Sequence, residues 1–262
     1  MKRYLVVLYT FYKAAILTDL EYRANFIISA ILSFINIGWQ IGGIGIFFIH
    51  TEKIGDWSFP EVLLVIGLYV TFLGFIEMIL YPNVQEIVRH IRLGTMDFIL
   101  TKPIDSQFHA SLRKISIWKG IDVVIGIGVV LYALYLQPTN PSAGNILLFG
   151  LLCICAVIIL YSLMMLLITS AFWFVQLENV MELLLIFFDA ARFPVTVFPA
   201  WLRVLLTFVV PIAFVTTIPA AVLLNRLDLN LALLSVVIAV GMLAISILFW
   251  RFALRHYSSA SS

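Results

Sequence analysis

The residues of this sequence that could do chemistry in an apolar setting are a few charged side chains inside long hydrophobic stretches. They are Glu77, Glu182, Asp189 and Arg192. Ionisable groups at membrane depth often mark an ion or proton path, which favours a secondary transporter that uses Glu77, Asp189 and Arg192. A structural explanation stands beside it, because Asp189 and Arg192 are three residues apart on one predicted helix and can form an ion pair.

The motifs of common enzyme classes are absent from the sequence. No Gly-x-x-x-x-Gly-Lys-Ser/Thr loop could hold ATP phosphates, and no His-Glu-x-x-His or Gly-x-Ser-x-Gly pattern occurs. The four histidines, at predicted loops and helix ends, are His50, His90, His109 and His256. Cys153 and Cys155 lie in an apolar run and point about 200° apart on a helix, so they are expected to pack or face lipid. We therefore expect no catalytic residue, no metal site and no cofactor in this chain.

The composition indicates that lipid surrounds most of the chain. Of 262 residues, 63% are hydrophobic and 11% are charged, whereas soluble domains have about 25% charged residues. A soluble fold of this size has no core large enough to hide that much apolar surface. These numbers exclude a soluble enzyme, a disordered region and a nucleic-acid binder. They predict an all-α integral membrane protein that forms a single transmembrane domain over 1–262.

Charge-free stretches predict where the chain crosses the membrane, since a spanning helix needs about 20 apolar residues. A loop divides the longest stretch at Gln137–Ser142, where two prolines lie among polar residues. The predicted six spans are about 24–48, 60–81, 114–136, 145–175, 178–197 and 229–251, of which 178–197 is less regular and carries Glu182, Asp189 and Arg192.

Residues 198–225 are predicted to form a helical hairpin that enters the outer leaflet and returns. Pro199, Pro211 and Pro219 divide this region into pieces too short to span. Trp201 and Arg203 suit the headgroup level, where aromatic and basic side chains anchor. The alternative is a seventh span over Val204–Leu224, because membrane helices tolerate proline.

The distribution of lysine and arginine predicts the orientation. With six spans, most of these residues lie at the N-terminus, in segment 82–119 and at the C-terminus, all on one side. Both termini are therefore expected in the cytoplasm, in a protein of the cytoplasmic membrane. Residues 1–22 are predicted to form an amphipathic helix with Lys2, Arg3 and Lys13 on one arc, lying in the membrane interface. The alternative is a cytoplasmic extension of the first span.

The segment between spans two and three is predicted to form a structured cytoplasmic elbow. Asn83 and Glu86 are spaced like a helix cap, and Val84, Ile87 and Ile91 repeat with helical period. Gly94 is placed to end this helix in the left-handed conformation. A short element follows over 96–100, and Asp105 or Ser106 could cap the helix leading into span three. A structured elbow suggests a docking partner; the alternative is an amphipathic loop lying on lipid headgroups.

At this point the sequence resembles a known family. The Gly94–Pro103 stretch has the pattern Gly-x-x-Asp-x-x-Leu-x-x-Pro, and a Phe198-Pro-Ala-Trp-Leu-Arg-Val stretch precedes the further prolines. With the interfacial helix and six spans, this resembles the permease subunit of ATP-binding-cassette exporters of the class often called type two. The similarity covers nearly the whole chain.

The resemblance implies that the elbow over 83–103 is a coupling helix seated in a separate ATPase subunit, which would bind ATP and magnesium. Its coupling residues would be Glu86, Arg89, Arg92, Gly94, Thr95, Asp97, Leu100 and Pro103. Ile87, Ile91, Phe98 and Leu100 would form its apolar seat. A second permease, identical or related, would complete a path between spans one, two and five below the hairpin. Small and polar residues of span one, from Asn36 to Gly45, suit either a subunit interface, the path or packing within the chain.

Overall fold

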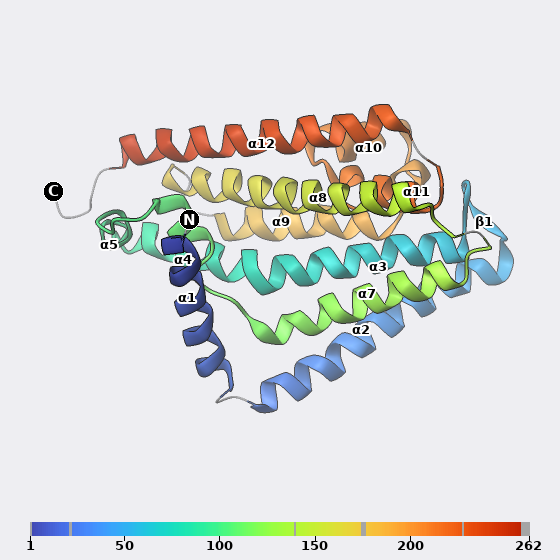
Figure 1. The fold of residues 1–262 in the computed structure, drawn as a ribbon, viewed down its shortest axis with the longest axis horizontal. Coiled ribbons are helices and arrows are strands. Elements are labelled where there is room, and N and C mark those ends of the chain that lie inside the picture. The colour runs from blue at the N-terminus through green and yellow to red at the C-terminus, as the bar shows by residue number, and fades with distance from the viewer. Residues whose placement is uncertain (1, 21–22, 139, 174–176, 227, 258–262) are drawn as a thin grey trace.

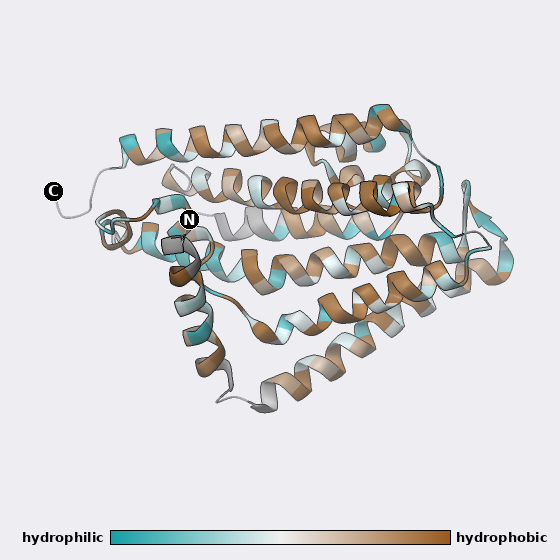
Figure 2. Cartoon of the chain, in the orientation of Figure 1, coloured by the Kyte–Doolittle hydropathy of each residue, from teal (hydrophilic) through white to brown (hydrophobic). Residues whose placement is uncertain are grey.

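The computed structural model describes the chain except for residues 1, 21–22, 139, 174–176, 227 and 258–262. Long helices run side by side and form one bundle (Figure 1). They are α2 (Arg23–His50), α3 (Phe59–Phe75), α7 (Gly120–Tyr135), α8 (Ala143–Thr169), α9 (Leu177–Asp189) and α12 (Leu229–His256). Within the described residues, five helices are long and apolar enough to cross a bilayer, or six if one bent pair counts as a span. Hydrophobic residues cover these helices between the two ends of the bundle (Figure 2).

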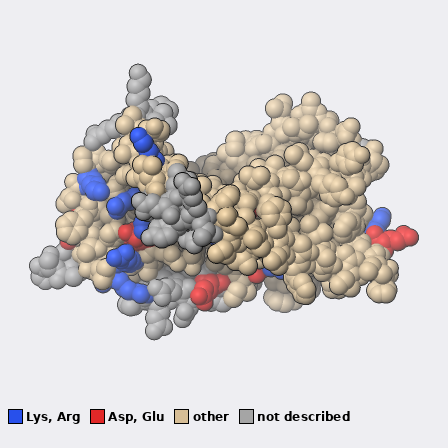
Figure 3. Space-filling model, turned by 90° about the horizontal axis from the view of Figure 1, so that it is seen from below, with Lys and Arg blue, Asp and Glu red and all other residues tan. Residues whose placement is uncertain are grey.

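The two ends of the bundle carry different short elements. At the elbow end lie α1 (Lys2–Leu20), α4 (Tyr81–Arg92), α5 (Asp97–Leu100), α6 (Ser106–Ser111) and the last turns of α12 (Figure 1). At the hairpin end lie α10 (Ala200–Val204), α11 (Thr217–Leu223) and the strands β1 (Lys53–Ile54) and β2 (Trp57–Ser58). The strands pair antiparallel, with Lys53 opposite Ser58. In the view of Figure 3, Lys and Arg gather at the elbow end, a few charged side chains lie along the lower edge and at the hairpin end, and a broad uncharged surface lies above them.

Short 3-10 and π segments connect or extend the helices. The 3-10 segments are η2 (Ile117–Lys119), η3 (Ser170–Phe172), η4 (Ala190–Arg192), η5 (Val195–Val197) and η7 (Ile212–Phe214). The π segments are η1 (Ile76–Leu80) and η6 (Leu205–Val209). Both π segments extend a preceding α-helix, α3 and α10 respectively, so they change the helical phase without ending the helix.

The helix of the second span does not break at Pro82, and the elbow begins as its direct continuation. Helix continues from Phe59 to Arg92 through η1, over 34 residues. Pro82 has no N–H for the carbonyl one turn before it. The Ser116 amide donates to that Met78 carbonyl instead, at 2.8 Å. Because a distant segment satisfies the freed carbonyl, the proline does not break the helix.

The region expected to be the fifth span is shorter than the sequence suggested. Helix α9 has 13 residues, and η4 extends it only to Arg192. The chain then becomes extended at Phe193 (φ −111°, ψ 145°), because the following Pro194 disfavours a helical conformation there. Figure 1 nevertheless shows α9 beside α8 and α3, running toward the hairpin end.

Helices α3 and α7 approach closely through glycines. A Cβ atom on Gly67 would lie 2.7 Å from the Val130 backbone nitrogen. One on Gly126 would lie 2.5 Å from the Thr71 nitrogen. Both distances are far below van der Waals contact, so only glycine permits this crossing. This contact fixes the register between the second and third spans.

Helix α2 packs on one side only. In the most apolar stretch of α2, 11% is buried inside the protein, whereas 67% is buried in the corresponding stretch of the helix over Phe59–Arg92. Gly38, Gly42, Gly43 and Gly45 have open space where a Cβ would lie. Packing of this glycine face within the chain, one of the expected roles, is therefore excluded for the described residues. Helix α1 lies across the direction of α3 and α8 (Figure 1), and its position in a membrane interface stays a prediction.

Candidate functional site

The elbow is an extension of span two followed by two short helices. Gly94 has φ +63°, which confirms its predicted role in ending the helix. The Thr95 amide donates to the His90 carbonyl (2.9 Å) and closes the turn. Helix α5 follows over Asp97–Leu100. Asp105 caps α6, as predicted, by accepting from the Phe108 amide at 2.9 Å.

Asn83 links the elbow to the segment before span three, and does not act as the expected helix cap. It is buried, and its side-chain amide donates to the carbonyls of Ile79 (2.6 Å) and Lys114 (2.7 Å). Its Oδ1 accepts from the Lys114 amide at 2.7 Å. Together with the Ser116–Met78 bond, these contacts hold segment 114–116 against η1 and α4.

Glu86, His90 and Thr95 form a network inside the elbow. The Glu86 carboxylate lies 2.8 Å from Lys114 Nζ and 3.5 Å from His90 Nε2. A 2.8 Å hydrogen bond joins His90 Nδ1 to Thr95 Oγ1. Of the residues expected to contact an ATPase, Glu86 and Thr95 thus bond within the elbow and define its shape.

Other expected contact residues lie on the surface of the elbow. Arg89, Arg92 and Pro103 are exposed, and Asp97 and Leu100 are half-buried. Phe98, expected in the apolar seat, is 72% exposed, whereas its neighbours Met96 and Ile99 are buried. Ile87 is buried as expected. Met96 and Ile99 therefore belong to the apolar seat that packs inside the protein. Phe98 instead points outward, as does Leu93, which is 62% exposed.

His109 ties the elbow to the N-terminal helix. Its ring is buried, with the Phe11 ring edge-on at 5.3 Å between centroids. Lys102 Nζ donates to Nε2 at 3.1 Å, because an ammonium has only donors. Burial, and next the Lys102 charge, lower the pKa of His109 from 6.5 to about 4. A neutral imidazole at this position therefore holds α1 and α6 together.

The region 198–225 forms a broken pair of helices. The limbs Ala200–Val209 and Ile212–Leu223 are bent by 73° relative to each other, with the break at Pro211. A single straight helix over Val204–Leu224 is thereby excluded, but the bend fits both a broken span and a re-entrant hairpin, so the hairpin stays a prediction. Both limbs lie at the hairpin end (Figure 1). Pro211 and Pro219 are buried, whereas Pro199 and Trp201 are exposed. Arg203 Nη2 donates to the carbonyl of Thr196 at 2.7 Å.

The hairpin is attached to the start of span two. Arg226 Nη2 lies 2.6 Å from Glu61 Oε1, and its guanidinium carbon lies 5.4 Å from the centre of the Trp57 ring. Trp57 Nε1 donates to Thr196 Oγ1 at 2.8 Å. These contacts connect β2, the chain before α10 and the chain after α11. Asn225, Arg226 and Asp228, which follow α11, are exposed.

Asp189 and Arg192 form the expected ion pair, at 3.0 Å between Oδ1 and Nη2. The sequence analysis missed their partner Tyr69, whose hydroxyl donates to Asp189 Oδ1 at 2.6 Å and whose ring lies under Arg192. Tyr69 is buried, but the side chains of Asp189 and Arg192 are 51% and 31% exposed. Tyr69 could not be linked to Asp189 from the sequence, because the two residues lie far apart in the chain.

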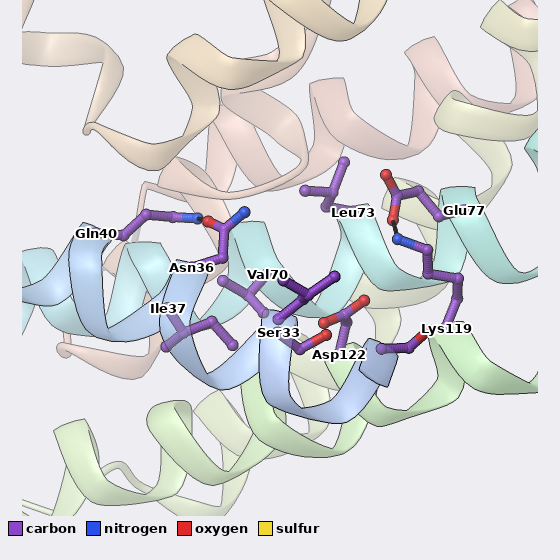
Figure 4. A pocket seen from close by; sticks show the side chains of 11 residues that line it. Ser33, Asn36, Ile37, Gln40, Val70, Leu73, Glu77, Lys119 and Asp122 are labelled. Atoms are coloured by element: carbon purple, nitrogen blue, oxygen red, sulfur yellow. Dashed lines mark hydrogen bonds and ion pairs between the residues drawn. The ribbon is translucent and has the colours of Figure 1, made fainter. Parts of the chain in front are cut away.

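Glu77 belongs to a separate polar cleft between α2, α3 and α7 (Figure 4). It lies 2.6 Å from Lys119 Nζ. The cleft does not include Asp189 or Arg192, so the three residues of the secondary-transport hypothesis do not share a site. Two separate ion pairs explain these charges.

Comparison with known protein families shows to which of them the chain belongs. The family model described as ABC-2 family transporter protein matches residues 34–261. The chain belongs to the ABC-2 transporter family. No curated protein and no solved structure matched it.

For this ABC-2 protein the family supports the role of a membrane permease in an ABC transporter. Its membrane-length apolar helices make it an integral membrane protein. Membership also implies an ABC ATPase as partner and lipid as surroundings. The resemblance seen in the sequence is thereby confirmed at the level of the family. The coupling role of the elbow remains to be argued from the geometry.

Proposed function

We propose that this chain is the membrane-spanning subunit of an ATP-driven exporter and that its elbow receives the motion of a separate ATPase. ATP and magnesium would bind in that ATPase. The observation that carries this proposal is the double hydrogen bond between Asn83 and Lys114, which joins the extended second span to the start of the third. A push on the elbow would thus move both spans as one body.

The exposed surface of the elbow suits a protein partner. Arg89, Arg92 and Leu93 line one groove, and Phe98 is exposed on α5. Arginine and aromatic residues are enriched at protein interfaces. Large exposed apolar side chains at the polar end of a membrane protein are unfavourable in water. Contact with the ATPase would remove Phe98 and Leu93 from water, with the arginines at the rim.

The charge distribution supports an elbow in the cytoplasm. The elbow end carries Arg89, Arg92, Lys102, Arg113 and Lys114, whereas basic residues are few at the hairpin end. By the positive-inside rule, both termini would lie in the cytoplasm and the hairpin would lie outside a cytoplasmic membrane. Helix α1 would lie in the inner interface.

Two surfaces support a second permease, identical or related. The glycine face of α2 is open, and small residues allow close helix contact in a membrane. Asp189 and Arg192 are partly exposed at the side of the bundle, where contact with lipid would be costly. A second permease or a hydrated path would cover them better, and the hairpin would close that path from outside.

The test is co-purification of the ATPase with the affinity-tagged chain from its native membranes. Arg89→Glu with Arg92→Glu should reduce the recovered ATPase several-fold and lower transport-stimulated ATP hydrolysis. Insertion should be unchanged, because both residues lie at the polar end. Lys53→Glu, a matched reversal at an exposed residue of the hairpin end, should have no effect. Unchanged ATPase recovery and unchanged hydrolysis in the double variant would contradict coupling through the elbow.

A further inference from the structure

One face of α2 carries a polar stripe that the function above does not use. Ser29, Ser33, Asn36 and Gln40 recur at helical spacing and line a cleft of about 170 Å³. The opposite face is apolar, and Ile31 on it is 53% exposed. Such a helix keeps its polar side away from lipid. Across the cleft lie Val70, Leu73 and Glu77 of the second span and Lys119 and Asp122 of the third (Figure 4).

Some polar groups of this cleft are already paired. Glu77 binds Lys119 at 2.6 Å, and Gln40 Nε2 donates to Asn36 Oδ1 at 2.7 Å. Gln40 Oε1 is buried without a partner. Among the described residues, Asp122 also has no hydrogen-bond or ion-pair partner, and Ser29 and Ser33 have none. Asp122, Ser29 and Ser33 are half-buried and open into the cleft, so a molecule bound there would be their partner.

The unpaired groups determine what kind of chemical group could bind in the cleft. The Asp122 carboxylate accepts only, the Gln40 carbonyl oxygen accepts only, and the serine hydroxyls can also accept. The charges of Glu77, Asp122 and Lys119 add up to −1 when all three are ionised, and Lys119 is already bound to Glu77. A cation with several N–H donors would satisfy this set. A primary ammonium group has three such donors.

The size and depth of the cleft suit a small headgroup. A volume of about 170 Å³ has room for several water-sized groups, since each needs ~10–15 Å³. Ser29 lies six residues after the start of α2, ~9 Å along the axis, and Asp122 is the third residue of α7. The part of the cleft around Ser29, Ser33 and Asp122 therefore lies in the elbow-side half of the bundle, and Gln40 lies deeper. At its elbow side the rings of Phe26 and Trp118 lie 5.6 Å apart, and such aromatic pairs favour the headgroup level.

We propose that this cleft binds a primary ammonium group, carried by an ethanolamine phospholipid of the elbow-side leaflet. Asp122 and Ser33, which lie beside each other in Figure 4, would accept its N–H donors. The Lys119 side chain is 42% exposed and would contact the lipid phosphate. The acyl chains would remain in the bilayer beside the apolar face of α2. The proposal does not depend on coupling to an ATPase, because the site belongs to the isolated chain.

The test counts phospholipids that stay bound to the purified full-length chain, by native mass spectrometry. The protein is taken from nanodiscs containing equal amounts of ethanolamine, choline and glycerol phospholipids. Charge-assisted hydrogen bonds predict a roughly tenfold preference for one ethanolamine lipid over one choline lipid, which lacks N–H donors. Asp122→Asn should remove the preference. Glu52→Gln, a neutralised exposed carboxylate at the hairpin end, should retain it.

A second arm distinguishes a lipid headgroup from a soluble amine. If free ethanolamine does not displace the bound lipid, the lipid is the source of the ammonium group. If free ethanolamine binds in its place, the ammonium site stands and its source is a soluble amine. Equal retention of all three lipids with no ethanolamine binding would overturn the proposal on the unmodified protein, whether or not the Asp122 variant folds. A preference unchanged by Asp122→Asn would overturn it as well.

Discussion

Asn83 and Lys114 are joined by two hydrogen bonds of 2.7 Å, one in each direction between the Asn83 side chain and the Lys114 backbone. The contact connects residues 31 positions apart, just where the second span leaves the bundle. Asn83→Ala would leave the amide and carbonyl of Lys114 without these partners. We expect a loss of about 2 kcal/mol in the free energy of unfolding.

The measurement is chemical unfolding of the purified chain in detergent, followed by tryptophan fluorescence. Asn140→Ala, at an exposed loop residue, is the matched control and should leave stability unchanged. Transport should fall with Asn83→Ala even where the protein is folded, because the elbow would move without the third span. Full stability and full transport would show that this contact does not join the two spans.

The glycine contact between α3 and α7 gives a prediction with a control on the same helix. Gly126→Ala would place a Cβ 2.5 Å from the Thr71 nitrogen, so the helices must separate. The cost of such overpacking is about 1–3 kcal/mol. Gly128→Ala has nothing within 4 Å and should be neutral or slightly stabilising. The measurement is thermal unfolding of both variants. Equal melting temperatures would argue against the close crossing of α3 and α7.

The buried imidazole of His109 predicts that stability falls in mild acid. Its pKa is lowered from 6.5 to about 4, so between these pH values the unfolded chain binds a proton that the native chain does not. Stability therefore decreases as pH falls through this window, by up to about 1.4 kcal/mol per pH unit. Lys102 and Arg113 add to the cost of protonation.

Replacement of the ring by a neutral amide tests this explanation. His109→Gln should remove part of the pH dependence of unfolding between pH 6.5 and 4. His50→Gln, at an exposed histidine of the hairpin end, should keep it. Identical pH profiles for the unmodified chain and His109→Gln would show that His109 does not stay neutral.

The orientation can be tested by cysteine labelling in a background without Cys153 and Cys155. Thr101→Cys, exposed on the elbow, should react with an impermeant thiol reagent only after the cells are opened. Asn140→Cys, in the loop between α7 and α8, should react in intact cells. Labelling of Thr101→Cys from outside would invert the proposed orientation.

Much of the fold could be predicted from charge-free stretches, because a bilayer demands apolar helices of a minimum length. The helix stop at Gly94 and the break at Pro211 were predictable from local backbone chemistry alone. The continuation of helix through Pro82 was not, since it depends on the Ser116 amide 34 residues later. The early end of the fifth span could have been inferred from Pro194.

The candidate sites, like the fold, have some features that could be predicted from the sequence and others that could not. The pairing of Asp189 with Arg192 follows from their spacing on one helix, but the contribution of Tyr69 depends on how α3 packs against α9. The polar stripe on α2 is visible in the spacing of Ser29, Ser33 and Asn36. Lys119 of η2 and Asp122 of α7 lie across the cleft from this stripe, and only the structure shows that they do.

The most direct test of the account is photo-crosslinking at the exposed aromatic residue of the elbow. Phe98→p-benzoylphenylalanine, in native membranes, should capture a protein that mass spectrometry identifies as an ATPase with a phosphate-binding loop. Trp201→p-benzoylphenylalanine is the control, since Trp201 is equally exposed but lies at the hairpin end. The account predicts ATPase adducts at Phe98 and none at Trp201. Adducts with lipid alone at Phe98, or ATPase adducts at Trp201, would contradict coupling through the elbow.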